Sequence, residues 1–268
     1  MDKQYTFSFL GCGNMGGALA TAAAKGNPGM NIAVFDPMTE KADALANAYE
    51  NVTVTDMADA AQNSAYLFIG VKPQMLASLF SQLSPLLPDD VTLVSMAAGT
   101  PIEAVEALAG KALPVIRIMP NIAVSVGKGV ILYAANGQVG AESLSFFVSA
   151  MSGAGLLDEI PEDKIDAASA VSGCGPAFAY MFIEALADGG VECGLPRDKA
   201  QKYAAAMLSG AAEHVLATGI HPGALKDAVC SPGGTTIAGV HALEGKGFRG
   251  AAADAVCAAY EKTLKLKG

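Results

Sequence analysis

Tryptophan is absent from the 268-residue sequence, only three histidines occur, and charged residues make up just 16% of the chain. The five cysteines are scattered and form no CxxC pair, so the sequence indicates neither a disulfide framework nor a zinc site, and we expect no bound metal. Acidic residues outnumber basic ones by 26 to 17, and the basic residues form no run. Nucleic acid is therefore not expected as a partner, because a polyanion needs a basic surface.

The sequence also lacks a hydrophobic run long enough for a membrane span, which needs roughly 20 apolar residues. The longest uncharged stretch lies between Asp166 and Glu184 and is interrupted by Gly173-Cys174-Gly175-Pro176. Its pattern predicts a buried helix with a kink at the proline. The apolar run near the N-terminus is too short for a signal peptide, so we expect a cytoplasmic protein without membrane association.

Hydrophobic residues are nevertheless abundant, at 52% of a chain that is long enough for two domains. Short apolar runs alternate with helical patterns over residues 1–160, and only helical patterns follow. This order predicts an α/β fold, with an N-terminal Rossmann-type, doubly wound, mostly parallel sheet in residues 1–160 and an all-helical C-terminal domain in residues 161–268. The helical domain is too small to surround its most apolar segment, so we expect a homodimer or a larger assembly.

A glycine-rich turn follows the first predicted strand, residues 5–10, and opens an alanine-rich helical pattern. Its sequence, Gly11-Cys12-Gly13-Asn14-Met15-Gly16, is the GxGxxG fingerprint in the setting that dinucleotide binding requires. Gly11 permits the tight turn, Gly13 lets a pyrophosphate approach the backbone, and Gly16 lets the helix pack closely on the strand. The alternative is a glycine turn in a βαβ unit that binds nothing.

An acidic residue, Asp36, ends the second predicted strand, twenty residues after Gly16. An acid at this position typically accepts hydrogen bonds from the ribose hydroxyls of adenosine. Its carboxylate would repel the 2′-phosphate of NADPH, and the next residue, Pro37, has no N–H to donate. The sequence therefore predicts that NADH competes well with NADPH, without deciding which is preferred.

Three further loops leave predicted strands at their carboxyl ends, where doubly wound sheets bind their ligands. These loops are Val71-Lys72-Pro73, Met96-Ala97-Ala98-Gly99 and Met119-Pro120-Asn121. The small residues of the second loop leave room for a flat nicotinamide ring. Each loop taken alone is equally well explained as an ordinary turn.

A second glycine turn, Ser231-Pro232-Gly233-Gly234-Thr235-Thr236, precedes an apolar helical pattern in the second half. The first N–H groups of a helix have no partner within it, and glycines leave them accessible, so such a turn suits a small anion. The alternative is a simple helix cap with Pro232 as a turn residue.

Side chains for acid–base catalysis are scarce. His214, His221 and His241 are most simply surface residues, and the sequence offers no Ser/His/Asp set or pair of carboxylates. Hydride transfer fits this scarcity, because it takes its reactivity from the cofactor and asks the protein mainly for position and electrostatics.

Several segments together resemble pyrroline-5-carboxylate reductases. They are FLGCGNMG, VKP and SMAAG in the first half, and VSGCGPAFAYMFIEALADGGVECGLPR with HPGALKDAVCSPGGTTIAGVHALE in the second. The resemblance covers nearly the whole chain. It implies an enzyme that reduces L-1-pyrroline-5-carboxylate to L-proline with NADPH or NADH, the last step of proline biosynthesis, and a helical domain that interlocks with its mate in a dimer.

The resemblance also implies which residues form the site. The turn residues Ser231, Gly233, Gly234 and Thr235 would bind the substrate carboxylate, Thr236 matches the catalytic threonine, and Glu162 matches an acid at the substrate site. Thr236 Oγ would hydrogen-bond the ring nitrogen while hydride crosses to the imine carbon. The residues expected to hold the dinucleotide are Leu10, Gly11, Cys12, Gly13, Asn14, Met15, Gly16, Asp36, Pro37, Val71, Lys72, Pro73, Met96, Ala97, Ala98 and Asn121.

Five positions depart from the family pattern. Ile122-Ala123 stands where Thr-Pro is usual, Cys174 replaces a serine, Phe178 a tyrosine and Ala228 an asparagine. The first change puts the polar contacts of that loop in question, and a thiol at Cys174 donates a weaker hydrogen bond than a hydroxyl. The glycine turn and Thr236 are unaffected.

Two alternatives remain open from the sequence. One is a reductase of β-hydroxyacids, which would place a catalytic lysine near the start of the interdomain helix, as Lys164 is, but has no use for the SPGGTT turn. The other is a dinucleotide-binding sensor without catalysis, since a fold does not imply a function.

Overall fold

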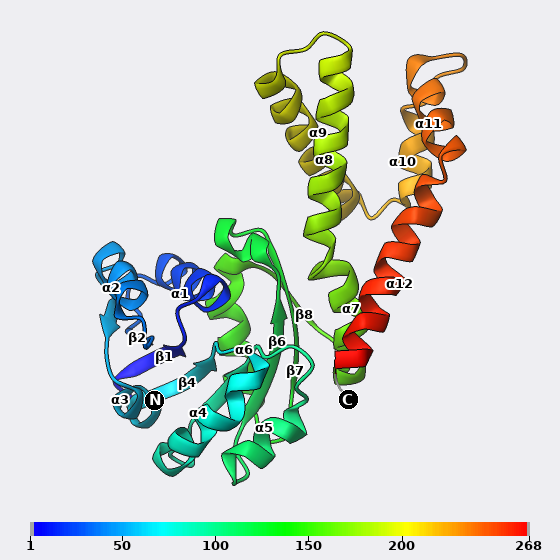
Figure 1. Cartoon of the computed structure of the whole chain (residues 1–268). Coiled ribbons are helices and arrows are strands. Elements are labelled where there is room, and N and C mark those ends of the chain that lie inside the picture. The colour runs from blue at the N-terminus through cyan, green and yellow to red at the C-terminus, as the bar shows by residue number, and fades with distance from the viewer. Residues whose placement is uncertain (1–2, 267–268) are drawn as a thin grey trace. The chain divides into compact units, whose positions relative to one another are not determined.

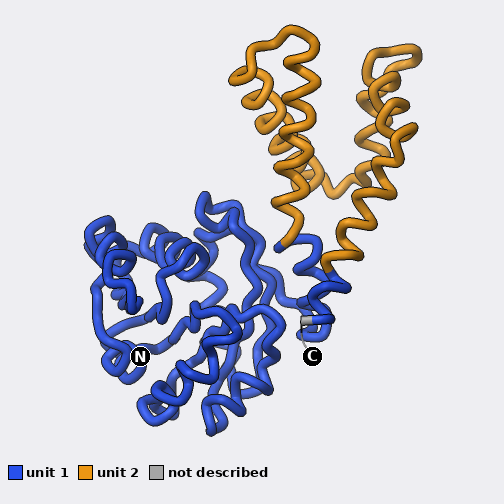
Figure 2. The backbone as a smooth tube through the Cα atoms, in the orientation of Figure 1, with its two compact units in different colours: residues 1–173, 260–268 blue, residues 174–259 orange. Residues whose placement is uncertain are grey.

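The computed structural model describes residues 3–266. The chain forms two compact units: residues up to 173 together with those from 260 onward make unit 1, and residues 174–259 make unit 2 (Figure 2). The described strands all belong to unit 1, whereas the regular structure of unit 2 is helical. The predicted domain boundary after residue 160 marks the point where the strands end, and it stays a prediction.

Unit 1 is built on an eight-stranded sheet with the order β3-β2-β1-β4-β5-β6-β7-β8 (Figure 1). All neighbouring strands pair in parallel except β6 and β7, which pair antiparallel. The short helix η3 (Ile122–Val126) joins these two strands, and so short a link leaves no room for a crossover. The predicted doubly wound, mostly parallel sheet is confirmed. The strands are β1 (Tyr5–Leu10), β2 (Ile32–Phe35), β3 (Val52–Val54), β4 (Ser64–Ile69), β5 (Thr92–Ser95), β6 (Val115–Pro120), β7 (Gly129–Ala135) and β8 (Gly155–Glu159).

Helices cover both faces of this sheet. Successive strand residues point to opposite faces, so Phe68 packs in one apolar cluster with α1, α2 and α6, while Leu67 and Ile69 pack in another with α3, α4 and α5. The helices of unit 1 are α1 (Asn14–Gly26), α2 (Thr39–Ala48), α3 (Met57–Asn63), α4 (Leu76–Leu83), α5 (Ile102–Ala109), α6 (Ala141–Met151) and α7 (Ile165–Ser172).

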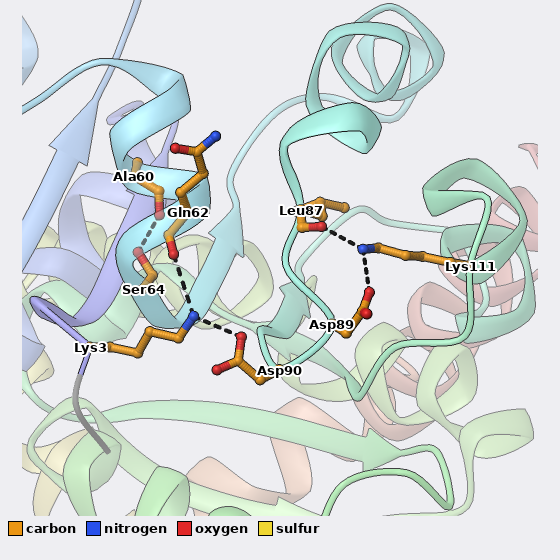
Figure 3. A network of polar contacts seen from close by, with 8 residues as sticks. All are labelled: Lys3, Ala60, Gln62, Ser64, Leu87, Asp89, Asp90 and Lys111. Carbon is orange, nitrogen blue, oxygen red and sulfur yellow. Dashed lines mark hydrogen bonds and ion pairs between the residues drawn. The ribbon is translucent and has the colours of Figure 1, made fainter.

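The amino ends of the strands are tied together by polar contacts (Figure 3). Lys3 Nζ lies 2.7 Å from Asp90 Oδ1 and donates to the Gln62 carbonyl oxygen at 3.4 Å. Lys111 Nζ similarly lies 2.7 Å from Asp89 Oδ1. These contacts occupy the edge opposite the carboxyl ends, which leaves the carboxyl edge for the site.

Unit 2 has few buried residues when the chain is taken alone. Its clearest packing is between α8 and α9, where Ala187, Ala200 and Ala204 are buried. The small residues let the two helices approach closely, since a Cβ at Gly190 would lie 3.1 Å from the Ala200 Cβ. The helices of unit 2 are α8 (Gly175–Glu192), α9 (Arg197–Thr218), α10 (Pro222–Ala228), α11 (Thr235–Gly245) and α12 (Phe248–Leu266), the last of which continues into unit 1.

The predicted apolar helix of residues 166–190 is interrupted where its sequence indicates. It is broken into α7 and α8 at Gly173-Cys174, and Pro176 sits in the first turn of α8. In the single chain Tyr180 is 60% and Met181 69% exposed, so burial of this helix requires a second subunit and stays a prediction. By length and composition alone, residues Glu162–Glu192 would pass as a membrane span, with 11% of the most apolar window buried.

Candidate active site

The glycine turn after β1 has the geometry that its sequence predicts. Gly11 has a φ of 101°, and a Cβ there would lie 2.7 Å from the Gly70 carbonyl oxygen. A Cβ on Gly16 would lie 2.0 Å from the Gly11 carbonyl oxygen, so only glycine lets α1 pack this closely. Around Gly13, by contrast, a Cβ would meet no atom within 4 Å, and no side chain caps α1. The backbone roles predicted for Gly11 and Gly16 are confirmed, whereas the approach of a pyrophosphate to Gly13, in the uncapped first turn of α1, stays a prediction.

Asp36 lies directly beside this turn and is held by it. Its Oδ2 accepts a hydrogen bond from the Cys12 N–H at 2.7 Å, and its Oδ1 accepts one from the Met38 N–H at 2.8 Å. A carboxylate has about four lone-pair sites, so each oxygen can still accept a ribose hydroxyl. The neighbouring Cys12 thiol is buried, and that burial, together with the Asp36 charge, raises the pKa of Cys12 to about 12.

An apolar cavity of about 340 Å³ opens next to Gly11 and Pro37. Its largely apolar lining suits an aromatic base such as adenine. The sequence did not indicate the lining residues Met57 or those of α4, although Met57 comes three residues after the end of β3. Val71 lines this cavity, whereas Lys72 is exposed at the start of the 3₁₀ helix η1 (Pro73–Met75). The lining residues are Leu10, Gly11, Phe35, Pro37, Met57, Val71, Gln74, Met75, Ser78, Leu79 and Gln82.

The loops after β5 and β6 lie at the same edge of the sheet, because β1, β4, β5 and β6 are parallel. Ala97 is buried, Met96 is half-buried and Ala98 is exposed. The loop after β5 therefore presents the small side chain of Ala98 at its surface. Asn121, in contrast, is buried, and its side-chain amide is bonded to backbone groups of the protein. Contact of these residues with the dinucleotide stays a prediction.

Glu162 takes part in a partly buried charge cluster within unit 1. Its Oε1 lies 3.2 Å from Arg117 Nη1 and accepts a hydrogen bond from the Ile102 N–H at 2.7 Å. Arg117 is fully buried on β6, and its Nη2 lies 3.0 Å from Asp166 Oδ1. These contacts hold the Glu162 carboxylate in one position. Its contact with the substrate stays a prediction.

The SPGGTT turn in unit 2 opens α11 without a side-chain cap. Gly233 has a φ of +67°, which favours glycine, and a Cβ on Gly234 would lie 2.3 Å from Ser231 Oγ, so a larger residue there would require the Ser231 side chain to move. The Gly234 N–H donates to the Ser231 carbonyl oxygen at 3.0 Å and closes the turn. Thr235 and Thr236 are exposed at the first turn of the helix. The turn therefore presents free helix N–H groups beside two hydroxyls, as an anion site requires.

The three histidines belong neither to the residues expected to hold the dinucleotide nor to the SPGGTT turn. His221 Nδ1 accepts a hydrogen bond from the Gly223 N–H at 3.1 Å and so caps α10, while His214 and His241 are exposed. Among residues 3–266, no cluster of His, Cys, Asp and Glu has the grouping of a metal site.

Comparisons with known proteins agree with these features. A family model described as pyrroline-5-carboxylate reductase dimerisation matches residues 162–266, and one described as NADP oxidoreductase coenzyme F420-dependent matches residues 6–99. Pyrroline-5-carboxylate reductase of Escherichia coli (strain K12) is 39% identical over 269 residues, which cover 99% of each chain.

Two solved structures are similar over almost their whole length. Pyrroline carboxylate reductase of Plasmodium falciparum with NADP bound has a TM-score of 0.87 and 29% identity, covering 99% of each chain. The pyrroline-5-carboxylate reductase of Coxiella burnetii has a TM-score of 0.89 and 29% identity, covering 98% of this chain and 99% of that one. The chain therefore belongs to the pyrroline-5-carboxylate reductase family of nicotinamide-dependent oxidoreductases.

Proposed function

We propose that the chain reduces the C=N bond of L-1-pyrroline-5-carboxylate to give L-proline, the final step of proline biosynthesis. Family membership supports this reaction, and the single structural observation that carries it is the uncapped Gly233-Gly234 turn at the start of α11. A substrate that is both an imine and a carboxylate needs an anion site next to the reacting bond. The turn supplies one in a chain whose net charge is −9.

In this reaction the turn from Gly233 to Thr235 holds the carboxylate through backbone N–H groups other than that of Gly234, which donates to the Ser231 carbonyl oxygen, and so orients the ring. The Thr236 hydroxyl hydrogen-bonds the ring nitrogen of the protonated imine and orients it. As the carbon takes up hydride, the C=N electron pair becomes the lone pair of the nitrogen, so no further proton is needed in this step. When bound, the reduced nicotinamide supplies that hydride. Glu162 provides a fixed negative charge for the cationic form of the imine, and Arg117 holds its Oε1.

The dinucleotide is held by the residues at the carboxyl edge of the sheet. The open first turn of α1 suits its pyrophosphate, Asp36 its ribose, and the cavity beside Pro37 its adenine. Both NADH and NADPH are used, and NADH competes well because the Asp36 carboxylate repels a 2′-phosphate.

The chain works as a homodimer in the cytoplasm, because in the single chain α8 exposes large apolar side chains such as Tyr180 and Met181. These residues lie in the segment that matches the dimerisation model. Burial of that face by a second copy supports the assembly proposed here, since exposed apolar patches of this kind mark interfaces. Gel filtration with light scattering measures the mass directly.

Steady-state oxidation of NADH and of NADPH, each with pyrroline-5-carboxylate, tests the proposed function. Turnover with either cofactor, and its loss on substitution of Thr236, is expected. Binding of NADH without turnover would instead favour a sensor. Turnover of a β-hydroxyacid with NAD but not of the imine would favour the other reductase class and refute the proposal.

A further inference from the structure

Asn121 is the polar residue whose side chain joins the most backbone segments at the edge of the sheet that carries the site. It follows β6 directly and is 7% exposed. Its Oδ1 accepts hydrogen bonds from the Ala123 and Val130 N–H groups, both at 3.2 Å, and its Nδ2 donates to the Ser172 carbonyl oxygen at 2.9 Å. One side chain thus links β6, η3, β7 and the end of α7.

The contact with Ser172 lies at the end of α7, close to the point where the chain passes from unit 1 into unit 2. Ser172 is the last residue of α7, and unit 2, which carries the SPGGTT turn, begins two residues later at Cys174. The last turn of α7 is tight as well, because the Gly173 N–H donates to the Ser169 carbonyl oxygen at 2.7 Å. Asn121 therefore fixes the place where the chain leaves unit 1.

An amide is the side chain that this position needs. Two N–H groups require an acceptor, and the Ser172 carbonyl requires a donor, so the side chain must accept with one atom and donate with the other. A carboxylate only accepts, and an aliphatic side chain would leave three buried backbone groups without partners. With its oxygen bonded twice, only one N–H of the amide is left for any ligand.

We propose that Asn121 is a positioning residue for the imine-reducing reaction, rather than a ligand of the dinucleotide as its sequence position suggests. It holds the end of α7 against the carboxyl end of β6, at the point from which the chain continues into the helical unit that carries the substrate turn. This inference rests on the proposed function. It requires that loss of the bond to Ser172 impairs use of the imine and leaves dinucleotide binding intact.

The test is the variant Asn121→Asp, which keeps the shape and the acceptor but replaces the donor. At high pH its second carboxylate oxygen faces the Ser172 carbonyl oxygen, and the two repel. At low pH the neutral acid can donate to that carbonyl. The variant's kcat/KM for the imine, divided by that of the unsubstituted chain, should fall at least about tenfold at pH 8 and should rise as the pH is lowered and the carboxyl becomes protonated.

Two controls separate positioning from general damage. The Kd for NADH, measured by fluorescence titration, should stay within about threefold in Asn121→Asp at high and at low pH. Ser125→Ala removes an exposed hydroxyl that bonds the Ile122 carbonyl oxygen in the same η3 turn, and it should leave both quantities unchanged. If Asn121→Asp does not fold, Asn121→Ser, which keeps a hydroxyl but is too short to reach Ser172, is measured in the same way and should raise the imine KM alone.

A kcat/KM ratio that stays near one at every pH would overturn the inference. So would a loss of NADH affinity that matches the loss of kcat/KM, because it would make Asn121 a dinucleotide ligand. Absence of turnover by the unsubstituted chain is a different result, since it would overturn the proposed function itself.

Discussion

The choice between NADH and NADPH depends on the charge of the Asp36 carboxylate. The substitution Asp36→Asn removes this charge and leaves the shape of the side chain almost unchanged. Two unit charges roughly 4 Å apart interact by about 1 kcal/mol in bulk water and by about 4 kcal/mol near a protein surface. A phosphate monoester carries about −1.5 to −2 charges at neutral pH. For a half-buried carboxylate such as Asp36, we take about 1.4 kcal/mol as the lower bound of its repulsion, which is a factor of ten in affinity.

The assay is the ratio of KM for NADPH to KM for NADH, with the imine saturating. We expect the substitution to lower this ratio at least about tenfold, and we expect added salt to lower the ratio of the unsubstituted enzyme, because screening weakens the repulsion. The asparagine oxygen can accept from only one of the Cys12 and Met38 N–H groups, so the variant should also unfold more readily. An unchanged KM ratio in a folded variant would refute the role given to the charge.

The other predictions concern the substrate turn and the buried thiol. Thr236→Ala should lower kcat/KM for the imine at least about tenfold while Thr236→Ser stays within about threefold; a loss under threefold for alanine would refute the role of the hydroxyl. Gly234→Ala should raise the imine KM because its Cβ would meet Ser231 Oγ at 2.3 Å, and adding Ser231→Ala should restore part of the loss; equal KM values in both variants would contradict this. At pH 8, far below its raised pKa of about 12, Cys12 should resist iodoacetamide while the exposed Cys193 reacts, as mass spectrometry can show. Equal labelling of the two cysteines would contradict the burial of Cys12.

The sheet was predictable because its inner strands, such as β1, β4 and β5, are buried on both faces and therefore appear as short apolar runs. The helix α3 was not predicted, since only its Ala60 and Ala61 are buried and a seven-residue helix shows little periodicity. A local signal was nevertheless present, because Asp56 accepts a hydrogen bond from the Asp59 N–H as an N-cap. The antiparallel turn into β7 depends on the length of the link after β6, which apolar patterns do not report.

At the site, motif residues were easier to predict than the residues that hold them. Gly11, Gly16 and Gly233 follow from backbone geometry, which short sequence motifs encode directly. The burial of Arg117 could not be predicted from the sequence. Its partners Glu162 and Asp166 lie far along the chain, and only the fold brings them within ion-pair distance. The amide of Asn121 was noticed only for its place after a strand, whereas its bonds come from three other segments of the fold.

The division of the chain has a consequence for how it folds during synthesis. Unit 1 includes both the N-terminal residues and those from 260 onward, with the whole of unit 2 encoded between them. The sheet can form early, since its last strand, β8, ends at Glu159. Unit 1 becomes complete only when the last turns of α12 have left the ribosome, so a nascent chain that stalls within α9 carries a finished sheet and an unfinished domain.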